Sequence, residues 1–157
     1  MDTLSKLVFG DQVLMKGVRE RLAAGHQVRY LPFRGISMLP MLRQGKDSVE
    51  LSPLPEKLKK YDLPVYQTPR GKYLMHRVVK VTPTHYICLG DNTLEYETIL
   101  PEQMIGLVTA FTRNGRRISV RNPFYRLYCI LWGLTPPLRR LYKRIRVKMT
   151  KKNPAAK

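Results

Sequence analysis

Residues 35–40, with the sequence Gly-Ile-Ser-Met-Leu-Pro, contain the serine that is best placed for nucleophilic chemistry. Ser37 stands between a glycine and a proline, in backbone that does not continue a helix or a strand, so a turn can present its hydroxyl to a groove. On this stretch alone an ordinary loop serine is the better interpretation, because a motif without its context is a weak warrant. Other residues must therefore supply the rest of the chemistry.

A serine hydroxyl is a poor nucleophile until a base removes its proton. The chain has three histidines. His26 lies at a predicted junction between a helix and a strand, and His85 lies in a predicted turn, so we expect both to be solvated. His76 lies inside the β-patterned segment 73–82, directly before Arg77. A lone histidine in a strand is usually structural, yet His76 is the candidate base.

An imidazole that acts as a base needs an acceptor to orient it. Three carboxylates follow His76 shortly downstream, in a predicted turn region after the next strand: Asp91, Glu95 and Glu97. The residue types alone do not show which of the three carboxylates orients His76. Asp91 has a structural alternative, because it can pair with Arg77 and tie two strands together.

Three motifs in order resemble the S24/S26 serine peptidase superfamily, and in particular the type I signal peptidases of the endoplasmic-reticulum kind. They are Gly-Ile-Ser-Met-Leu-Pro at 35–40, Leu-Met-His-Arg-Val-Val at 74–79 and Tyr-Ile-Cys-Leu-Gly-Asp-Asn at 86–92. The resemblance covers residues 34–110, and the Ile-Gly pair at 105–106 before a strand also fits it. Three ordered motifs together are a strong signal, whereas each one alone is weak.

The resemblance implies that Ser37 is the nucleophile and His76 the general base, at a position where eubacterial relatives use lysine. It implies that Glu97 orients the imidazole, in place of the aspartate of the family, and it leaves Asp91 and Glu95 as rivals. It further implies that the cleaved bond follows a small residue such as alanine, in a peptide that lies extended along a strand edge.

The remaining candidate residues surround the nucleophile. Gly35 stands where eubacterial relatives often have a serine that helps to bind the oxyanion, so the oxyanion is left to backbone N–H groups, chiefly that of Ser37. Gly35, Ser37 and Met38 are the candidates for binding the substrate and the oxyanion, although plain core packing also explains Met38. Pro40 and Arg77 are interpreted as structural residues near the site.

The elements that must position these residues follow from the periodicity of the apolar residues. Leu14, Val18 and Leu22 recur at helical spacing and predict an amphipathic helix over 11–24. Short β-type stretches follow, at 27–33, 48–51, 63–67, 73–82, 86–89 and 104–112. Asn114 and Gly115 predict a hairpin turn into another strand at 118–120.

The last third of the chain returns to helical spacing. Asn122 and Pro123 predict the start of one helix, and Thr135 before two prolines predicts the start of a second, strongly basic helix. We therefore expect a mainly β (α+β) fold, with a signal-peptidase or LexA-like β core, an N-terminal helix and two C-terminal helices. The expected division is a peptidase domain over 1–121 with its core at 27–121, basic amphipathic helices over 122–149, and a disordered tail over 150–157.

The charge of the chain is concentrated near its C-terminus. The 157 residues carry 29 Lys+Arg against 11 Asp+Glu, a formal charge of +18, and residues 113–157 hold fourteen of the basic residues and no acid. The second predicted C-terminal helix combines an apolar stripe with these cations, a pattern typical of contact with an anionic membrane surface. The same pattern also fits a helix that packs on the β body with solvated cations.

The composition and the apolar runs of the chain restrict its fold class, its cellular location and its possible cofactors. With 43% hydrophobic and 25% charged residues, wholesale disorder is excluded and one compact domain is expected. The longest apolar run, 127–134, is far below the roughly 20 residues that cross a bilayer, and residues 1–10 lack a signal-peptide pattern. We expect a cytoplasmic protein, with at most a peripheral contact on the inner face of the membrane. Cys88 and Cys129 lack metal-ligand spacing, so both are expected to be reduced and buried, with no metal and no cofactor.

These observations favour a serine endopeptidase that processes a leader, signal or propeptide segment of a peptide or protein precursor. Two alternatives stay open: a non-catalytic member of the same fold that binds peptides, and a basic regulator that binds nucleic acid. The presence of both Ser37 and His76 argues against the first. Nucleic acid is the less expected partner, because about 34 residues with one predicted helix precede the peptidase-like part, too few for a helix-turn-helix module.

Overall fold

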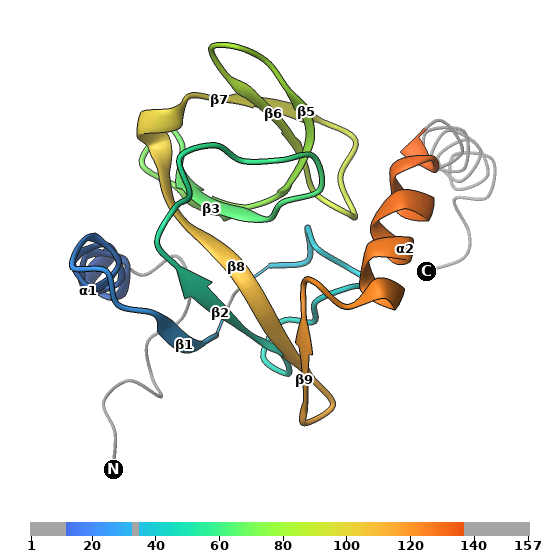
Figure 1. Ribbon diagram of the computed structural model, residues 1–157, viewed down its shortest axis with the longest axis horizontal. Coiled ribbons are helices and arrows are strands. Elements are labelled where there is room, and N and C mark those ends of the chain that lie inside the picture. The colour runs from blue at the N-terminus through green and yellow to red at the C-terminus, as the bar shows by residue number, and fades with distance from the viewer. Residues whose placement is uncertain (1–11, 33–34, 137–157) are drawn as a thin grey trace, which may run out of the picture.

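The computed structural model describes residues 12–32 and 35–136, and this part of the chain is mainly β, with antiparallel sheets and two α-helices (Figure 1). The expected mainly β (α+β) fold class is therefore confirmed. The second expected C-terminal helix and the tail over 150–157 lie outside the described residues.

The strands form two antiparallel sheets. The elements are α1 (Gln12–Ala23), β1 (Val28–Pro32), β2 (Ser48–Ser52), β3 (Pro64–Gln67), β4 (Tyr73–Met75), β5 (Arg77–Val81), β6 (Tyr86–Leu89), β7 (Tyr96–Ile99), the 3₁₀ turn η2 (Pro101–Gln103), β8 (Met104–Arg113), β9 (Arg116–Ser119) and α2 (Pro123–Gly133). The larger sheet has the order β1-β2-β8-β3-β4, with β9 also paired to β8, and the smaller sheet has the order β5-β6-β7. The ten-residue β8 pairs with three other strands, so it is the centre of the fold.

The predicted N-terminal helix packs on the larger sheet. Leu14, Met15, Val18 and Leu22 of α1 are buried, as the helical spacing of the apolar residues predicts. Gly106 of β8 allows the close approach, because an added Cβ would lie 2.5 Å from the Cδ1 atom of Leu22. The chain therefore has its smallest residue where helix and sheet touch.

The segment 73–82, expected to be one strand, is two strands in different sheets. β4 pairs with β3 in the larger sheet, and β5 pairs with β6 in the smaller one. His76 is the residue between them. Met75 and Val78 on the two sides of the crossing are both buried, and no glycine or proline separates them, so the sequence pattern has no mark of the break. The expectation of one continuous strand was wrong at this residue.

The region around Glu97, expected to be a turn, is the edge strand β7 of the smaller sheet. Cys88 of β6 pairs with Glu97, and Leu89 pairs with Tyr96. The strand was not predicted because its sequence, Tyr-Glu-Thr-Ile, is mostly polar and only Ile99 is buried. An edge strand needs fewer apolar residues than a central one, which explains the weak signal.

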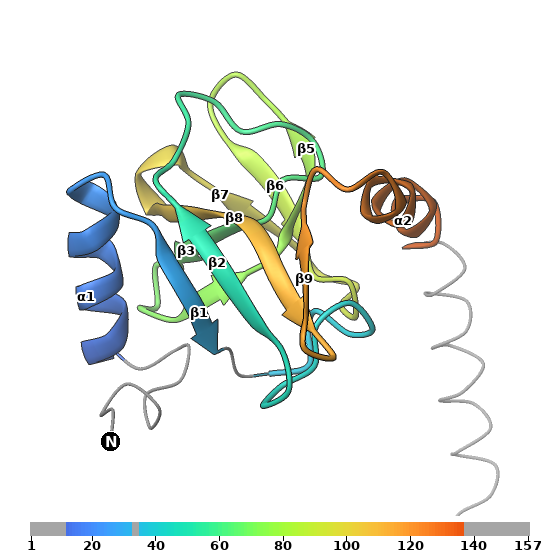
Figure 2. The same cartoon turned by 60° about the horizontal axis from the view of Figure 1, so that its bottom comes forward.

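The hairpin and the helix expected near the C-terminal end are both present. Asn114 and Gly115 have φ angles of 51° and 74° and connect β8 to β9. The Asn122 side chain caps α2, because its Oδ1 accepts hydrogen bonds from the N–H groups of Phe124 and Tyr125, at 2.9 Å and 3.3 Å. α1 and α2 lie on opposite sides of the β body in both views (Figure 1, Figure 2).

Candidate active site

His76 lies at the crossing between the two sheets and is held there by a carboxylate. Its side chain is buried, and its Nδ1 atom lies 2.7 Å from Oε2 of Glu97. Because a carboxylate accepts, the proton of a neutral imidazole is held on Nδ1 and the lone pair is left on Nε2. Nε2 is buried and has no hydrogen-bond partner among the described residues. This nitrogen is therefore available to take a proton from another group.

Tyr66 is a third member of this cluster that the sequence did not indicate. Its side chain in β3 is fully buried, and its hydroxyl donates to Oε2 of Glu97 and lies 3.1 Å from Nδ1 of His76. Burial, followed by the neighbouring Glu97, raises the pKa of Tyr66 far above its usual value, so the phenol keeps its proton. One feature of the sequence could have indicated Tyr66: a tyrosine in a core strand needs a hydrogen-bond partner for its buried hydroxyl. No sequence pattern identifies that partner.

Glu97 is an ionised acceptor in this cluster. Burial by itself raises the pKa of Glu97, but hydrogen bonds from His76 and then Tyr66 outweigh it and bring the pKa below its usual value. A carboxylate that accepts two hydrogen bonds stays charged at neutral pH. Glu97 can therefore hold the imidazole in one tautomer and stabilise an imidazolium.

The loop of Ser37 is attached to the Gly-Asp-Asn motif. The carbonyl oxygen of Ser37 accepts a hydrogen bond from the N–H of Asn92 at 2.7 Å, and that of Ile36 accepts from the Asn92 side chain at 3.2 Å. An added Cβ on Gly90 would lie 2.8 Å from the Ser37 carbonyl oxygen and 3.0 Å from Nε2 of His76. The three motifs thus meet at Gly90, with the Ser37 backbone and Nε2 of His76 next to the same point.

Two backbone N–H groups near the nucleophile differ in their availability. Gly35, at a φ of 103°, donates its N–H to Oε1 of Gln44 at 2.8 Å, so this group is occupied. The N–H of Ser37 makes no hydrogen bond within the described part of the chain. An unoccupied backbone donor beside a nucleophile is what an oxyanion site requires. Of these two N–H groups, that of Ser37 is therefore the one that can donate to an oxyanion.

Met38 and Pro40 are structural residues of the loop. Met38 is buried in the main apolar cluster, so its side chain has a packing role. The peptide bond between Leu39 and Pro40 is cis, and the carbonyl oxygen of Pro40 accepts from Arg113 at 2.8 Å. Both residues shape the turn that presents Ser37, which is half-buried.

Asp91 is engaged with Arg77 and not with His76. The two side chains are buried and form two hydrogen bonds, from Nε to Oδ1 at 2.9 Å and from Nη2 to Oδ2 at 2.7 Å. Burial by itself lowers the pKa of Arg77, but the charge of Asp91 raises it well above its ordinary value. Of the three carboxylates left open by the sequence, Glu97 contacts the imidazole, Asp91 forms this ion pair, and Glu95 is exposed.

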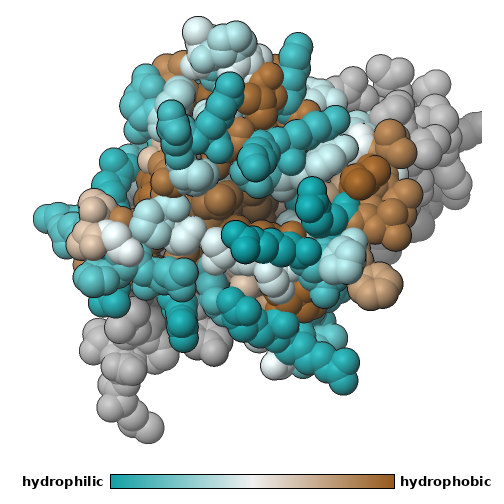
Figure 3. All heavy atoms as spheres, in the orientation of Figure 1, coloured by the Kyte–Doolittle hydropathy of each residue, from teal (hydrophilic) through white to brown (hydrophobic). Residues whose placement is uncertain are grey.

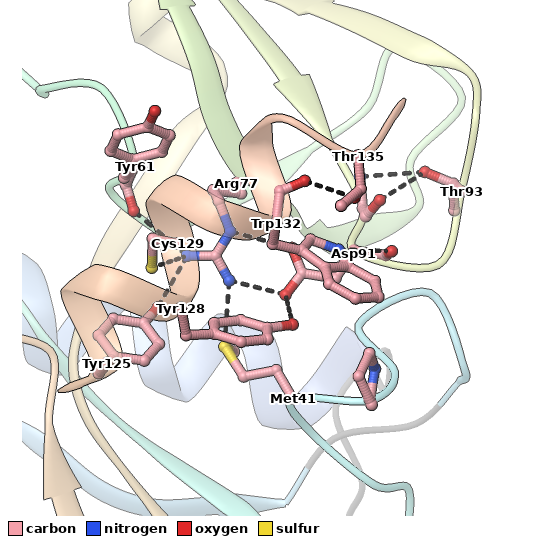
Figure 4. Close-up of polar contacts among 12 residues, drawn as sticks. Met41, Tyr61, Arg77, Asp91, Thr93, Tyr125, Tyr128, Cys129, Trp132 and Thr135 are labelled. Carbon is pink, nitrogen blue, oxygen red and sulfur yellow. Dashed lines mark hydrogen bonds and ion pairs between the residues drawn. The ribbon is translucent and has the colours of Figure 1, made fainter. Parts of the chain in front are cut away.

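The Arg77–Asp91 pair is also the attachment point of α2 (Figure 4). Nη1 of Arg77 donates to the Tyr125 hydroxyl at 2.8 Å and to the Cys129 sulfur at 2.9 Å. The Tyr128 hydroxyl donates to Asp91 at 2.9 Å, and the indole N–H of Trp132 donates to the Asp91 carbonyl oxygen at 2.8 Å. The helix is thereby connected through Asp91 to its neighbours Gly90 and Asn92, which contact the nucleophile loop.

The two cysteines take no part in this chemistry. Cys88 and Cys129 are free and buried, as expected. Burial, and then the charge of Glu97, raises the pKa of Cys88 to about 12, and burial also raises the pKa of Cys129. Both thiols are therefore protonated and unreactive at neutral pH.

Comparison of the chain with family models, with curated proteins and with solved structures returned no match. Within residues 12–32 and 35–136, no group of three or more histidine, cysteine, aspartate and glutamate side chains could hold a metal ion. Across the same residues, no helix has both the length and the apolar character needed to cross a bilayer.

Proposed function

We propose that this protein is a serine endopeptidase in which Ser37 is the nucleophile, His76 the general base and Glu97 the residue that orients the base. The observation that carries the proposal is the position of His76. Its Nδ1 lies 2.7 Å from Oε2 of Glu97, and its Nε2 is buried next to the Ser37 loop without a hydrogen-bond partner in the part of the chain that the structure describes. A structural core histidine would be expected to have both nitrogens satisfied.

The reaction is an acyl transfer in two steps. Nε2 of His76 takes the proton of the Ser37 hydroxyl while the serine oxygen attacks the peptide carbonyl, and the Ser37 N–H donates to the developing oxyanion. The imidazolium, stabilised by ionised Glu97, then gives its proton to the leaving amine. Water hydrolyses the acyl-enzyme in the same way and regenerates the serine.

The substrate is an extended segment of a peptide or protein precursor, such as a leader, signal or propeptide. β4 is the last strand in the order of the larger sheet and leads directly into His76, so a peptide that adds to this edge reaches the base. Cleavage after a small residue is taken from the resemblance to S24/S26 peptidases.

The test is peptide cleavage by wild-type protein and by Ser37→Ala, on a diverse peptide library with products identified by mass spectrometry. We expect cleavage by the wild type, loss of at least about a thousandfold in Ser37→Ala, and wild-type cleavage by the control Ser52→Ala. Ser52 is half-buried in β2 and its hydroxyl faces the carbonyl of Pro53, so it matches the change of residue without touching the site.

Two different results would contradict the proposed function. Equal cleavage by wild type and Ser37→Ala removes the serine mechanism. Saturable binding of library peptides without any cleavage by folded wild-type protein identifies a non-catalytic peptide-binding protein instead. Circular dichroism on each variant shows whether a loss of activity comes with a loss of fold.

A further inference from the structure

α2 is apolar around most of its circumference. Its eleven residues include one charged side chain, Arg126. One side, which we call the inner face, packs on the β core through Tyr125, Tyr128, Cys129 and Trp132. A helix that is hydrophobic all round is normally covered on every side, so the opposite side of α2 also requires a partner.

The opposite side of α2 is exposed to solvent. Phe124 is 81% exposed and Leu134 is 69% exposed. Five of the ten exposed large apolar side chains of the described residues lie on α2 or directly after it, and Figure 3 shows hydrophobic residues gathered over this helix. We call them the outer face: Phe124, Leu127, Ile130, Leu131 and Leu134. Single exposed apolar residues are ordinary, but a contiguous group of this kind marks an interaction site.

The charge around the outer face indicates the chemistry of the partner. Arg121 precedes α2 and Arg126 lies on it, both are exposed, and neither forms an ion pair with a described residue. The sequence that follows, 137–157, adds nine further Lys and Arg and no acid. An apolar face in a segment of the sequence that has cations and no acid is complementary to a surface that is apolar inside and anionic at its boundary.

Two other occupants fit less well. A second copy of the chain would bring two segments, each with fourteen basic residues and no acid, against each other. Insertion across a bilayer is also excluded for α2, because eleven residues extend about 16 Å against a hydrocarbon thickness of about 30 Å.

We infer that the outer face of α2 docks on an anionic membrane surface, with the helix parallel to the surface and its apolar side chains in the interface. The inner face keeps its contacts with Arg77 and Asp91, so the β body stays on the aqueous side. This inference is independent of the proposed peptidase activity, because it concerns binding and uses no residue of the Ser37, His76 and Glu97 cluster.

The experiment is sedimentation of the full chain with phosphatidylcholine vesicles that contain about one-third phosphatidylglycerol, compared with vesicles of phosphatidylcholine alone. Leu127→Ser/Leu131→Ser is the test variant, because the two residues are 51% and 55% exposed and belong to neither buried apolar cluster of the described residues. Val13→Ser is the matched control, since Val13 is 74% exposed on α1, at the other side of the molecule. Circular dichroism confirms that each variant is folded.

We expect wild type and Val13→Ser to bind the anionic vesicles with partition coefficients within about twofold of each other, and the double variant to bind at least about tenfold more weakly. Binding to neutral vesicles should be weaker than to anionic ones. Absence of wild-type binding overturns the inference, and so does equal binding by the double variant, which would assign the contact to basic residues alone. Dimerisation that the double variant abolishes, without vesicle binding, would assign the outer face to a second copy and also overturn it.

Discussion

Tyr66 connects the base and the acid of the candidate site. Its hydroxyl donates to Glu97 and adjoins His76, in a fully buried position. This donor adds a second hydrogen bond to the carboxylate and fixes the direction from which Glu97 reaches the imidazole. Tyr66 acts through Glu97, so it is a positioning residue.

We expect Tyr66→Phe to lower kcat about ten- to a hundredfold and to cost about 1.5–3 kcal/mol of the free energy of unfolding, because a hydrogen bond to a charged group is lost. The variant is assayed by peptide cleavage and by urea unfolding. Tyr86→Phe is the control, since Tyr86 is buried in the same apolar cluster and its hydroxyl accepts from the N–H of Leu58 instead. Equal loss of kcat in both variants would contradict the positioning role.

Glu97 should also be visible in the pH dependence of stability. Its pKa in the folded protein is below its usual value, so its ionised form stabilises the fold above the unfolded pKa of about 4.3, and this contribution is lost as the pH falls through the folded pKa. We expect the difference in the free energy of unfolding between wild type and Glu97→Gln to be largest near pH 6–7 and to shrink below about pH 4. Urea unfolding at a series of pH values measures it. A difference that is constant over this range would mean that Glu97 has no lowered pKa.

At the scale of elements, α2 packs on the β core through Tyr125 and Cys129 and is also held to it by a buried ion pair. The carboxylate of Asp91 receives Arg77 and Tyr128, and its backbone receives Trp132. The aromatic rings of Tyr125, Tyr128 and Trp132 stack along the inner face of the helix. The position of α2 therefore depends on a charge that the helix itself does not carry.

Asp91→Asn is expected to destabilise the fold by about 3–5 kcal/mol, because it leaves the buried Arg77 without its counter-ion. Trp132 is the only tryptophan, so its emission reports the contact with Asp91 directly, and we expect a shift to longer wavelength. Turnover per folded molecule should fall less than it does in Glu97→Gln. A variant with unchanged stability and abolished turnover would instead give Asp91 a catalytic role.

At the scale of the whole molecule, the site exists because two sheets and a loop converge on Gly90. The Ser37 loop follows β1, His76 lies between β4 and β5, and Glu97 lies on β7. Each of the two sheets contributes part of the cluster, and neither contains the whole. A change at the convergence point should therefore disturb the chemistry without removing any reacting group.

Gly90→Ala tests this convergence. The added Cβ would meet the Ser37 carbonyl at 2.8 Å, so the loop and the imidazole must move apart, and we expect kcat to fall at least about a hundredfold. Gly17→Ala is the control, because a Cβ there meets nothing within 4 Å in the middle of α1 and should add about 0.5–1 kcal/mol of stability. Cleavage assays and urea unfolding measure both. Wild-type kcat in Gly90→Ala would show that the three motifs do not have to meet this closely.

The local elements of this protein were determined by the sequence itself. Leu14, Val18 and Leu22 predict α1 because helical periodicity depends only on neighbours along the chain, and Asn114 and Gly115 predict the hairpin because they tolerate a positive φ. The motifs around Ser37 and His76 were likewise visible as residue types in order. These features need no knowledge of distant contacts.

Only the tertiary structure decided which groups share the site. The break at His76 comes from a crossing between sheets, and the burial of Tyr66 against Glu97 comes from β3 facing β7, neither of which leaves a periodic trace. The partners of Asp91 and Glu97 also could not be assigned from the sequence, because both are carboxylates that follow His76 at a short distance along the chain. One faces Arg77 and the other faces His76, because side-chain partners at long range are selected by the packing of strands and not by spacing along the chain.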